Sequence, residues 1–254
     1  MELRKWVTND IELQAILEKR GLADKTPDTN SCLNIDHKKV LGVRWNTETD
    51  CFYFTPNVII EAAAKFKRLT KRSFAKIATK IFNPLGFIGP VTLQFKLPFQ
   101  EIWETKLGWD DQVPSQAEKK FQAMVEDLHN IEKIQIPRMI SSTAEFGIKH
   151  QELHVFCDAS TKTYGAVAYT RSTNPKQIRL VCCKTRAAPL PKNELSLPRL
   201  ELMSAELGST LAERIINTID NIQWEVTLWT DSMATLGWIQ GEPARWKLFV
   251  RNRV

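Results

Sequence analysis

The sequence lacks any apolar run of roughly eighteen residues, the shortest that predicts a transmembrane helix. Its first ten residues, MELRKWVTND, also lack the apolar stretch of a secretory signal. We therefore expect an intracellular protein, in the cytoplasm or the nucleus, without a membrane partner. Its 254 residues are enough for one large domain or two ordinary ones.

Paired cysteines are missing as well. The five cysteines form an odd set without C-x-x-C spacing: Cys32, Cys51, Cys157, Cys182 and Cys183. This pattern argues against a disulfide framework or a cysteine zinc site and favours a reducing compartment. His150 and His154 are four residues apart, but His154 opens an apolar run typical of a strand, so the pair does not predict a metal site on a helix.

Acidic residues are absent from two stretches that are rich in cations. The first contains Lys65, Lys67, Arg68, Lys71, Arg72, Lys76 and Lys80, and the second contains Arg245, Lys247, Arg251 and Arg253 interleaved with Trp246 and Phe249. The net charge is +6. A solvated face explains either stretch alone, whereas two in one chain indicate contact with phosphates. The candidate nucleic-acid contacts are Lys65, Arg68, Lys71, Arg72, Lys76, Lys80, Arg245, Lys247 and Arg251.

The first half of the chain predicts a β-hairpin followed by helices. Residues 40–54 predict two short strands around an Asn-Thr-Glu-Thr-Asp turn. From about 58 to 131 the pattern is helical, with one apolar stripe formed by Phe74, Ile77, Ala78, Ile81 and Phe82. The prolines and glycines of NPLGFIGP, residues 83–90, interrupt it. A later helix begins at Ser115, with Glu118 completing a capping box.

The second half predicts an α/β domain. A weakly periodic stretch at 137–151 marks a domain boundary, after which strands are expected at 153–158, 164–170, 178–184 and 226–230. A helix with Pro198 in its first turn lies between the last two strands. It carries an apolar stripe (Leu200, Leu207, Leu211, Ile215) beside small residues (Ala205, Gly208, Ala212) that suit close approach to a sheet. Ser232 caps a final short helix that ends at Gly241.

Three carboxylates stand at the ends of these predicted elements. Asp158 ends the first strand, Asp231 ends the fourth, and Glu201 lies in the first turn of the helix. If the first and fourth strands are neighbours, their ends place the two aspartates side by side, and the helix packs across the sheet with Glu201 facing them. Converging carboxylates repel one another unless a cation neutralises them, and their hard oxygens suit Mg²⁺ or Mn²⁺. A pair of such ions is the usual device for in-line displacement at phosphorus.

Each carboxylate alone has a simpler interpretation. Asp158 suits a turn, Glu201 interacts favourably with a helix dipole, and Asp231 before Ser232 suits a helix cap. A structural domain whose carboxylates only cap helices would bind no Mg²⁺. Their joint placement at the ends of these elements favours the metal site.

At these residues the chain resembles retrotransposon Pol polyproteins of the BEL/Pao class, from the end of the reverse transcriptase into the ribonuclease H domain. The matching stretches are LRKWVTND, VLGVRWN, TKRSFAKIATKIFNPLGFIGPVTL, ELHVFCDASTKTYGAVAY, KTRAAPL, LPRLELMSAEL, LWTDSMATLGWI and RWKLFVRNRV. They cover nearly the whole chain in sequence order, so the resemblance is specific.

The resemblance implies three parts: the tail of the polymerase palm at 1–55, a helical thumb/connection and linker at 56–149, and a C-terminally truncated ribonuclease H-like mixed sheet with helices at 150–254. It implies that the basic thumb grips an RNA–DNA hybrid or a primer–template duplex. Asp158, Glu201 and Asp231 match the first three metal-binding acids of a nuclease that cuts the RNA strand, and their order differs from the Asp, Asp, Glu of integrases. The remaining expected partners are the polymerase palm and integrase of the same polyprotein.

The sequence departs from the family pattern at three points. No Tyr-x-Asp-Asp pair precedes the thumb, so the chain is not expected to polymerise DNA. The Asp-Thr-Gly or Asp-Ser-Gly turn of an aspartic peptidase is missing, and the nearest strings are DTN at 28 and DSM at 231. A Pao retrotransposon peptidase label would therefore describe the polyprotein. The nuclease's fifth strand and fourth acid would follow Val254, so the alternative is a catalytically inactive, truncated remnant that only binds nucleic acid.

Overall fold

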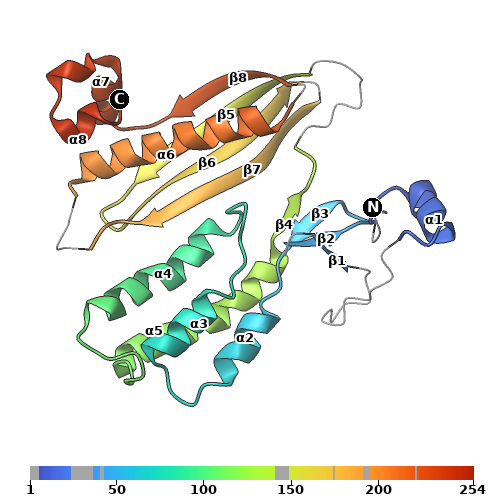
Figure 1. The fold of residues 1–254 in the computed structure, drawn as a ribbon, viewed down its shortest axis with the longest axis horizontal. Coiled ribbons are helices and arrows are strands. Elements are labelled where there is room, and N and C mark those ends of the chain that lie inside the picture. Colours follow the sequence, from blue (N-terminus) through green and yellow to red (C-terminus); the bar gives the residue numbers. More distant parts are fainter. Residues whose placement is uncertain are drawn as a thin grey trace.

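A computed structural model describes residues 6–23, 37–40, 43–140, 149–173, 175–190, 195–220 and 222–254. Figure 1 shows a small sheet beside the N-terminal helix, a helical unit, and a larger sheet with a long helix across it. The chain is therefore of the mixed α/β class that the sequence predicts. No helix within these ranges is both long and apolar enough to cross a membrane.

The small sheet is antiparallel and draws on two distant parts of the chain. After α1 (Ile11–Lys19), its strands lie in the order β1 (His37–Val40), β2 (Val43–Asn46), β3 (Cys51–Tyr53) and β4 (Gln135–Pro137). β2 and β3 form the predicted hairpin, in which Asn46 pairs with Cys51. Arg138, just after β4, forms an ion pair with Asp50 of the hairpin turn at 2.6 Å. The chain thus returns to this sheet after the helical unit.

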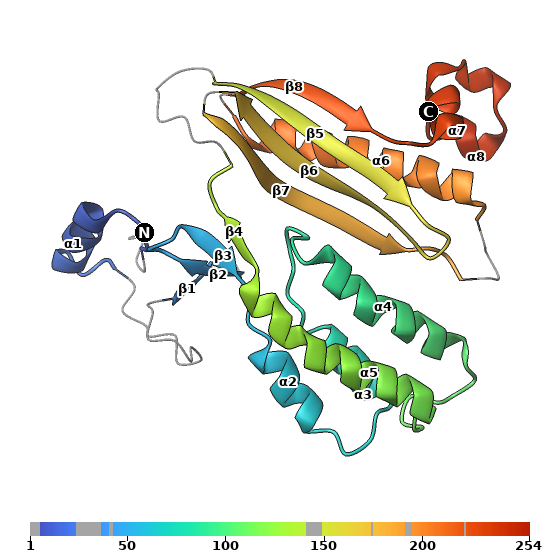
Figure 2. The ribbon, with the colours of Figure 1, turned by 180° about the vertical axis from the view of Figure 1, so that it is seen from behind.

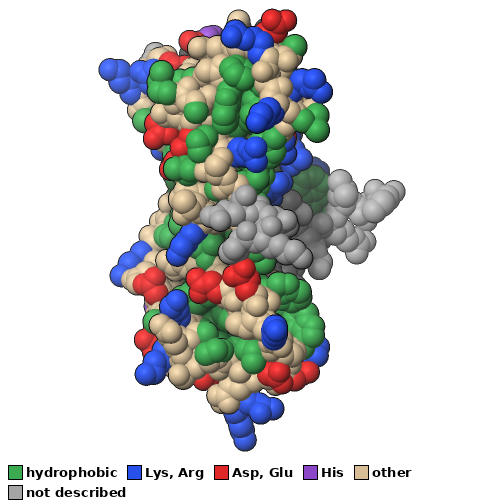
Figure 3. All heavy atoms as spheres, turned by 90° about the vertical axis from the view of Figure 1, so that its left-hand side faces the viewer, with side chains coloured by type: hydrophobic (Ala, Val, Ile, Leu, Met, Phe, Trp, Pro, Cys, Tyr) green, Lys and Arg blue, Asp and Glu red, His purple; other side chains and the backbone are tan. Residues whose placement is uncertain are grey.

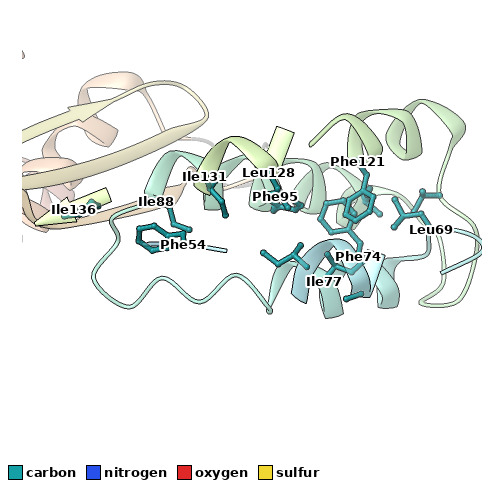
Figure 4. Packing of buried hydrophobic residues seen from close by; sticks show 14 residues of the cluster. Phe54, Leu69, Phe74, Ile77, Ile88, Phe95, Phe121, Leu128, Ile131 and Ile136 are labelled. Atoms are coloured by element: carbon teal, nitrogen blue, oxygen red, sulfur yellow. The ribbon is translucent and has the colours of Figure 1, made fainter. Parts of the chain in front are cut away.

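The helical unit is built around one hydrophobic core, which Phe54 and Ile136 extend to the small sheet. It contains α2 (Asn57–Ala64), α3 (Lys71–Ala78), α4 (Gly89–Glu104), α5 (Ser115–Asp127) and the 3₁₀ helix η1 (Leu128–Lys133). Figure 4 shows Phe74, Phe95 and Phe121 together in this core. The ring centroids of Phe74 and Phe121 lie 4.9 Å apart, and Phe74 is fully buried. Aromatic pairs of this kind add stability beyond the contribution of the apolar area that they bury.

Two local predictions for this unit are wrong. The apolar stripe does not extend to Phe82, because α3 ends at Ala78 and Phe82 is 53% exposed. After Ala78 the backbone forms tighter i→i−3 turns, in which the N–H of Lys80 donates to the carbonyl of Ile77 at 2.9 Å and that of Ile81 to the carbonyl of Ala78 at 3.3 Å. The capping box is wrong because Pro114 is the N-cap of α5 and no side chain caps it. Glu118 instead accepts a hydrogen bond from the backbone N–H of Leu69 at 3.3 Å.

The larger sheet has the strand order β7-β6-β5-β8. The strands are β5 (Lys149–Ala159), β6 (Thr163–Thr173), β7 (Lys176–Ala187) and β8 (Ile222–Trp229), and each is longer than predicted. β6 pairs antiparallel with both β5 and β7, whereas β5 and β8 are parallel neighbours. The first and fourth predicted strands are thus adjacent. Most of the predicted domain boundary, residues 141–148, lies outside the described residues.

One face of this sheet is covered by α6 (Leu197–Thr218), which lies across β5 and β6 in Figure 1. The predicted small-residue stripe explains the close approach, because a side chain at Gly208 would overlap the sulfur of Cys157 on β5. Burial raises the pKa of the Cys157 thiol to about 11, so it stays a neutral part of the core. Beyond β8 follow α7 (Met233–Gln240), η3 (Pro243–Arg245) and α8 (Leu248–Arg251).

Candidate functional site

The parallel pairing of β5 with β8 brings two of the predicted acids to one edge of the sheet. The last paired residues are Phe156 and Trp229. Asp158 follows the first by two residues and Asp231 follows the second by two, so both acids lie beyond the same end of the ladder. Both are exposed. The Oδ1 atom of Asp158 accepts a hydrogen bond from the backbone N–H of Ala159 at 2.7 Å, which orients the carboxylate.

Asp158 lies on the sheet face opposite α6. Side chains alternate between the faces of a strand, so Asp158 shares the face of Phe156 and His154, while Leu153, Val155 and Cys157 are buried on the other side. Figure 2 shows this opposite face, which no helix of the described chain crosses at β5 and β8. The carboxylate is therefore accessible from solution.

A polar and aromatic cluster holds the ends of β5 and β8 together on that face. The rings of Phe156 and Trp229 stack with their centroids 6.0 Å apart and an angle of 11°. The indole N–H of Trp229 donates to Nδ1 of His154 at 3.2 Å, so the imidazole donates from Nε2 to Glu152 at 2.9 Å. Hydrogen bonds from His154, and then from Arg171, lower the pKa of Glu152. The cluster fixes both strands just before the two acids.

Glu201 has a different position from the two aspartates. It lies in α6, one residue beyond the first turn, and it is half-buried. Its backbone carbonyl accepts a hydrogen bond from the Ser204 hydroxyl at 2.7 Å. Within the described ranges, no three His, Cys, Asp or Glu side chains lie close enough together to hold a metal ion. Asp158 and Asp231 offer exposed oxygens that suit Mg²⁺, but they do not form a three-carboxylate set with Glu201 in this geometry.

The basic stretch of the helical unit divides into exposed and engaged cations. Lys65, Arg68, Lys76 and Lys80 are exposed. Lys71 is buried: its ammonium donates to the carbonyl of Thr105 at 3.0 Å and lies 5.6 Å from the ring centre of Trp103. Arg72 forms two hydrogen bonds with Asp110, at 2.7 and 2.9 Å, which lower the pKa of that carboxyl group. Lys71 is thus part of the core of the helical unit, and Arg72 is already paired.

The C-terminal basic stretch uses its aromatic residues internally. The guanidinium groups of Arg199 and Arg253 lie over the ring of Phe249, at 5.0 and 4.0 Å from its centre. The indole N–H of Trp246 donates to the carbonyl of Trp238 at 3.1 Å. These contacts hold the segment against α6 and α7. The remaining predicted contacts, Arg245, Lys247 and Arg251, are exposed.

The cations are dispersed on at least one side of the molecule. On the face seen in Figure 3, Lys and Arg side chains alternate with acidic and apolar ones over both lobes and form no single patch. A continuous basic stripe is therefore not a property of that face. Contact with phosphates would depend on the individual exposed cations of the helical unit and of the C-terminal segment.

Comparison with known families gives one match. The model of the Pao retrotransposon-like RNaseH-like domain matches residues 70–232, which is more than half of the 254 residues. The match spans α3 to α5 and the larger sheet as far as Ser232, so it includes Asp158, Glu201 and Asp231. No match was found among curated proteins.

Among solved structures, the foamy viral protease-reverse transcriptase dRH, in complex with double-stranded DNA, has a similar fold. It aligns with a TM-score of 0.52 and 16% identity and covers 93% of this chain. The chain spans 38% of the length of that protein. The alignment with the foamy viral protease-reverse transcriptase in complex with double-stranded DNA covers 85% of this chain and 41% of that protein, at 16% identity. Its TM-score of 0.22 is too low to support an inference.

Proposed function

We propose that this chain, which belongs to the family of Pao retrotransposon-like RNaseH-like domains, cuts the RNA strand of RNA–DNA hybrids in a metal-dependent reaction. The observation that carries the proposal is the parallel pairing of β5 with β8, which leaves Asp158 and Asp231 each two residues beyond the last pair, Phe156 and Trp229. Two exposed carboxylates at the same end of two paired strands suit a divalent cation. The duplex in the foamy viral complex supports a double-stranded nucleic acid as the ligand class.

In this proposal each group has a stated role. Asp158 and Asp231 would hold Mg²⁺ or Mn²⁺. A bound ion of this kind supplies stabilisation of the negative charge on the phosphate that is cut. The stacked ring of Trp229 and its hydrogen bond to His154 keep the end of β8 beside β5, so they position the two aspartates. The exposed cations of α3 and its flanking loops would neutralise backbone phosphates without reading sequence.

We also propose how the chain divides within a Pol polyprotein. The hairpin within residues 1–55 would be the tail of the polymerase palm, the helices of 56–149 the thumb or connection, and residues 150–254 the ribonuclease H-like domain. The distinct hydrophobic clusters of the helical unit and of the sheet of β5 to β8 support the boundary between the second and the third part. The polymerase palm and the integrase of the polyprotein would act with this chain as partners.

A second candidate is a module that binds a hybrid without cutting it. The observation in its favour is that no set of three potential metal ligands assembles within the described part of the chain. Under this alternative the basic surfaces would still hold the duplex, and Mg²⁺ would make no difference to the RNA strand.

The experiment that separates the two candidates uses strand-specific labels. The chain is incubated with an RNA–DNA hybrid that carries different fluorophores on its two strands, with Mg²⁺, with Mn²⁺ or with EDTA. A nuclease shortens only the labelled RNA, only with a divalent ion, and leaves double-stranded DNA intact. An intact RNA strand under all conditions, together with binding of the hybrid, supports the non-cutting alternative.

Substitution of two exposed lysines tests whether the helical unit binds the phosphates of the hybrid. The double variant Lys76→Ala, Lys80→Ala is expected to bind RNA–DNA hybrids more weakly and to lower the slope of log affinity against log salt by about 2, since each phosphate contact contributes about 1. Fluorescence anisotropy over a salt series measures both. Lys119→Ala, an exposed lysine on α5, is the control. A salt slope equal to that of the wild type would remove these lysines from the interface.

A further inference from the structure

The segment Asn83–Pro90, which leads from the end of α3 into the first two residues of α4, is packed directly against the larger sheet. Gly86 has a left-handed backbone with φ +77, and a side chain there would overlap the carbonyl oxygen of Cys183 on β7. The neighbouring Leu85 carbonyl accepts a hydrogen bond from the backbone N–H of Cys183 at 2.8 Å. Only glycine combines this conformation with this approach. The segment is therefore attached to β7 backbone to backbone.

Two further contacts extend the attachment along α4. A Cβ at Gly89, the first residue of α4, would lie 2.7 Å from the sulfur of Cys183. Near the other end of the helix, Gln100 donates from its side-chain amide to the carbonyl of Ala188 at 2.7 Å. Leu180 of β7 also packs against the core of the helical unit. The helical unit and the sheet are thus joined at several points separated along one helix.

The attachment reaches the candidate site. A cavity of about 440 Å³ lies between the start of α4 and the sheet face opposite α6. Phe87 and Pro90 line it from the segment, Phe156 and Tyr169 line it from the sheet, and Asp158 lies at its edge. A shift of the segment would therefore move one wall of the space beside Asp158.

We infer that the segment Asn83–Pro90 is a docking joint that fixes the basic helical unit relative to Asp158, so that both bind one duplex as a single surface. Two binding surfaces held at a fixed separation increase each other's effective concentration, and a loose connection loses that gain. Gly86 and Gln100 are then positioning residues for hybrid binding. The inference rests on the proposed ligand, an RNA–DNA hybrid, but it does not require that the chain cuts it.

The test measures binding in EDTA, so that it is independent of cleavage. Wild type, Gly86→Ala and Gln100→Ala are titrated by fluorescence anisotropy with a short hybrid of about 8 base pairs and a long one of about 24, which spans both surfaces. The control is Gly237→Ala, because a side chain at that position meets no atom within 4 Å. Hydrogen exchange of the Cys183 amide reports in parallel whether the joint has opened.

The docking joint predicts faster exchange at Cys183 in Gly86→Ala and a loss of about tenfold in affinity for the long hybrid, with affinity for the short one unchanged. Gln100→Ala, which removes one hydrogen bond, gives the same dependence on length if Gly86→Ala does not fold. Equal affinities of the variants and the wild type for the long hybrid would overturn the inference, as would an equal loss for both lengths. Failure of the proposed cleavage alone would show as intact RNA with Mg²⁺ and unchanged results in EDTA.

Discussion

Asp158→Asn is expected to lower the rate of hybrid cleavage by about a hundredfold or more while the chain still folds and binds the hybrid. Asparagine has the same size but no negative charge, so it removes most of the attraction for a divalent cation. The lost transition-state stabilisation would be about 3 kcal/mol or more. Single-turnover cleavage with Mg²⁺, beside binding in EDTA, separates the loss of chemistry from a loss of affinity.

The matched control for this prediction is Asp220→Asn. Asp220 is also exposed, but it lies before the start of β8, at the opposite end of the strand from Asp231. The same chemical change there is expected to leave the rate of cleavage unchanged. Equal rates for Asp158→Asn and the wild type, or equal losses for both variants, would remove the special role of the β5–β8 edge.

Phe74→Ala is expected to have the largest effect on stability, with a loss of about 4 kcal/mol in the free energy of unfolding. Phe74 is 0% exposed and packs against Phe99 and Phe121, with ring centroids 5.6 and 4.9 Å away. Loss of the ring would leave a cavity between α3 and the aromatic residues of α4 and α5. Urea unfolding followed by tryptophan fluorescence measures the change, since Trp103 and Trp109 belong to this unit.

Phe82→Ala is the comparison, because the sequence predicts both phenylalanines on one apolar stripe. In the structure Phe82 is 53% exposed, beyond the end of α3. Its replacement is expected to cost less than about 1 kcal/mol. A similar cost at the two positions would mean that α3 continues to Phe82, as the sequence pattern alone predicts.

Much of the sheet could be predicted because its signals are local. The alternation of Leu153, Val155 and Cys157 along β5 and the small residues of α6 identify the buried face, and Ser232 identifies the start of α7. The adjacency of β5 and β8 was a condition of the predicted site, and the parallel pairing of the two strands meets it. The placement of Asp158 and Asp231 at one edge could therefore be predicted only on that condition.

Other features depend on partners far away in the sequence. Lys71 lies in a run of cations that predicts an exposed side chain. Its ammonium group instead donates to the carbonyl of Thr105 and contacts the ring of Trp103 inside the helical unit. The hydrogen bond between Trp229 and His154 could not be predicted, because the indole comes from a residue 75 positions later in the chain. The contact of His154 with Glu152 belongs to the same cluster. The pattern in the sequence that could have identified this cluster is the alternation of polar and aromatic residues from Glu152 to Asp158, which places them on one face of a strand.

The direction in which Glu201 points could not be predicted from its position near the end of a helix. Its place near the start of α6 could be predicted, and the helix does pack across the sheet. The sequence also predicts that Glu201 faces the two aspartates, but α6 covers the face opposite Asp158, and no three-ligand group forms within the described part of the chain. The position of a residue along a helix determines which part of the sheet it lies beside. The direction of its side chain depends on the rotation of the helix about its own axis.

Binding of Mn²⁺ is the measurement that tests the central claim most directly, because it concerns the β5–β8 edge itself. Electron paramagnetic resonance counts free and bound Mn²⁺ for the wild type, Asp158→Asn, Asp231→Asn and Asp220→Asn, each with and without a hybrid. The account predicts that the wild type and Asp220→Asn bind Mn²⁺ and that the other two variants bind it at least about tenfold more weakly. Equal Mn²⁺ affinities in all four proteins, or no binding by the wild type even with the hybrid present, would contradict it.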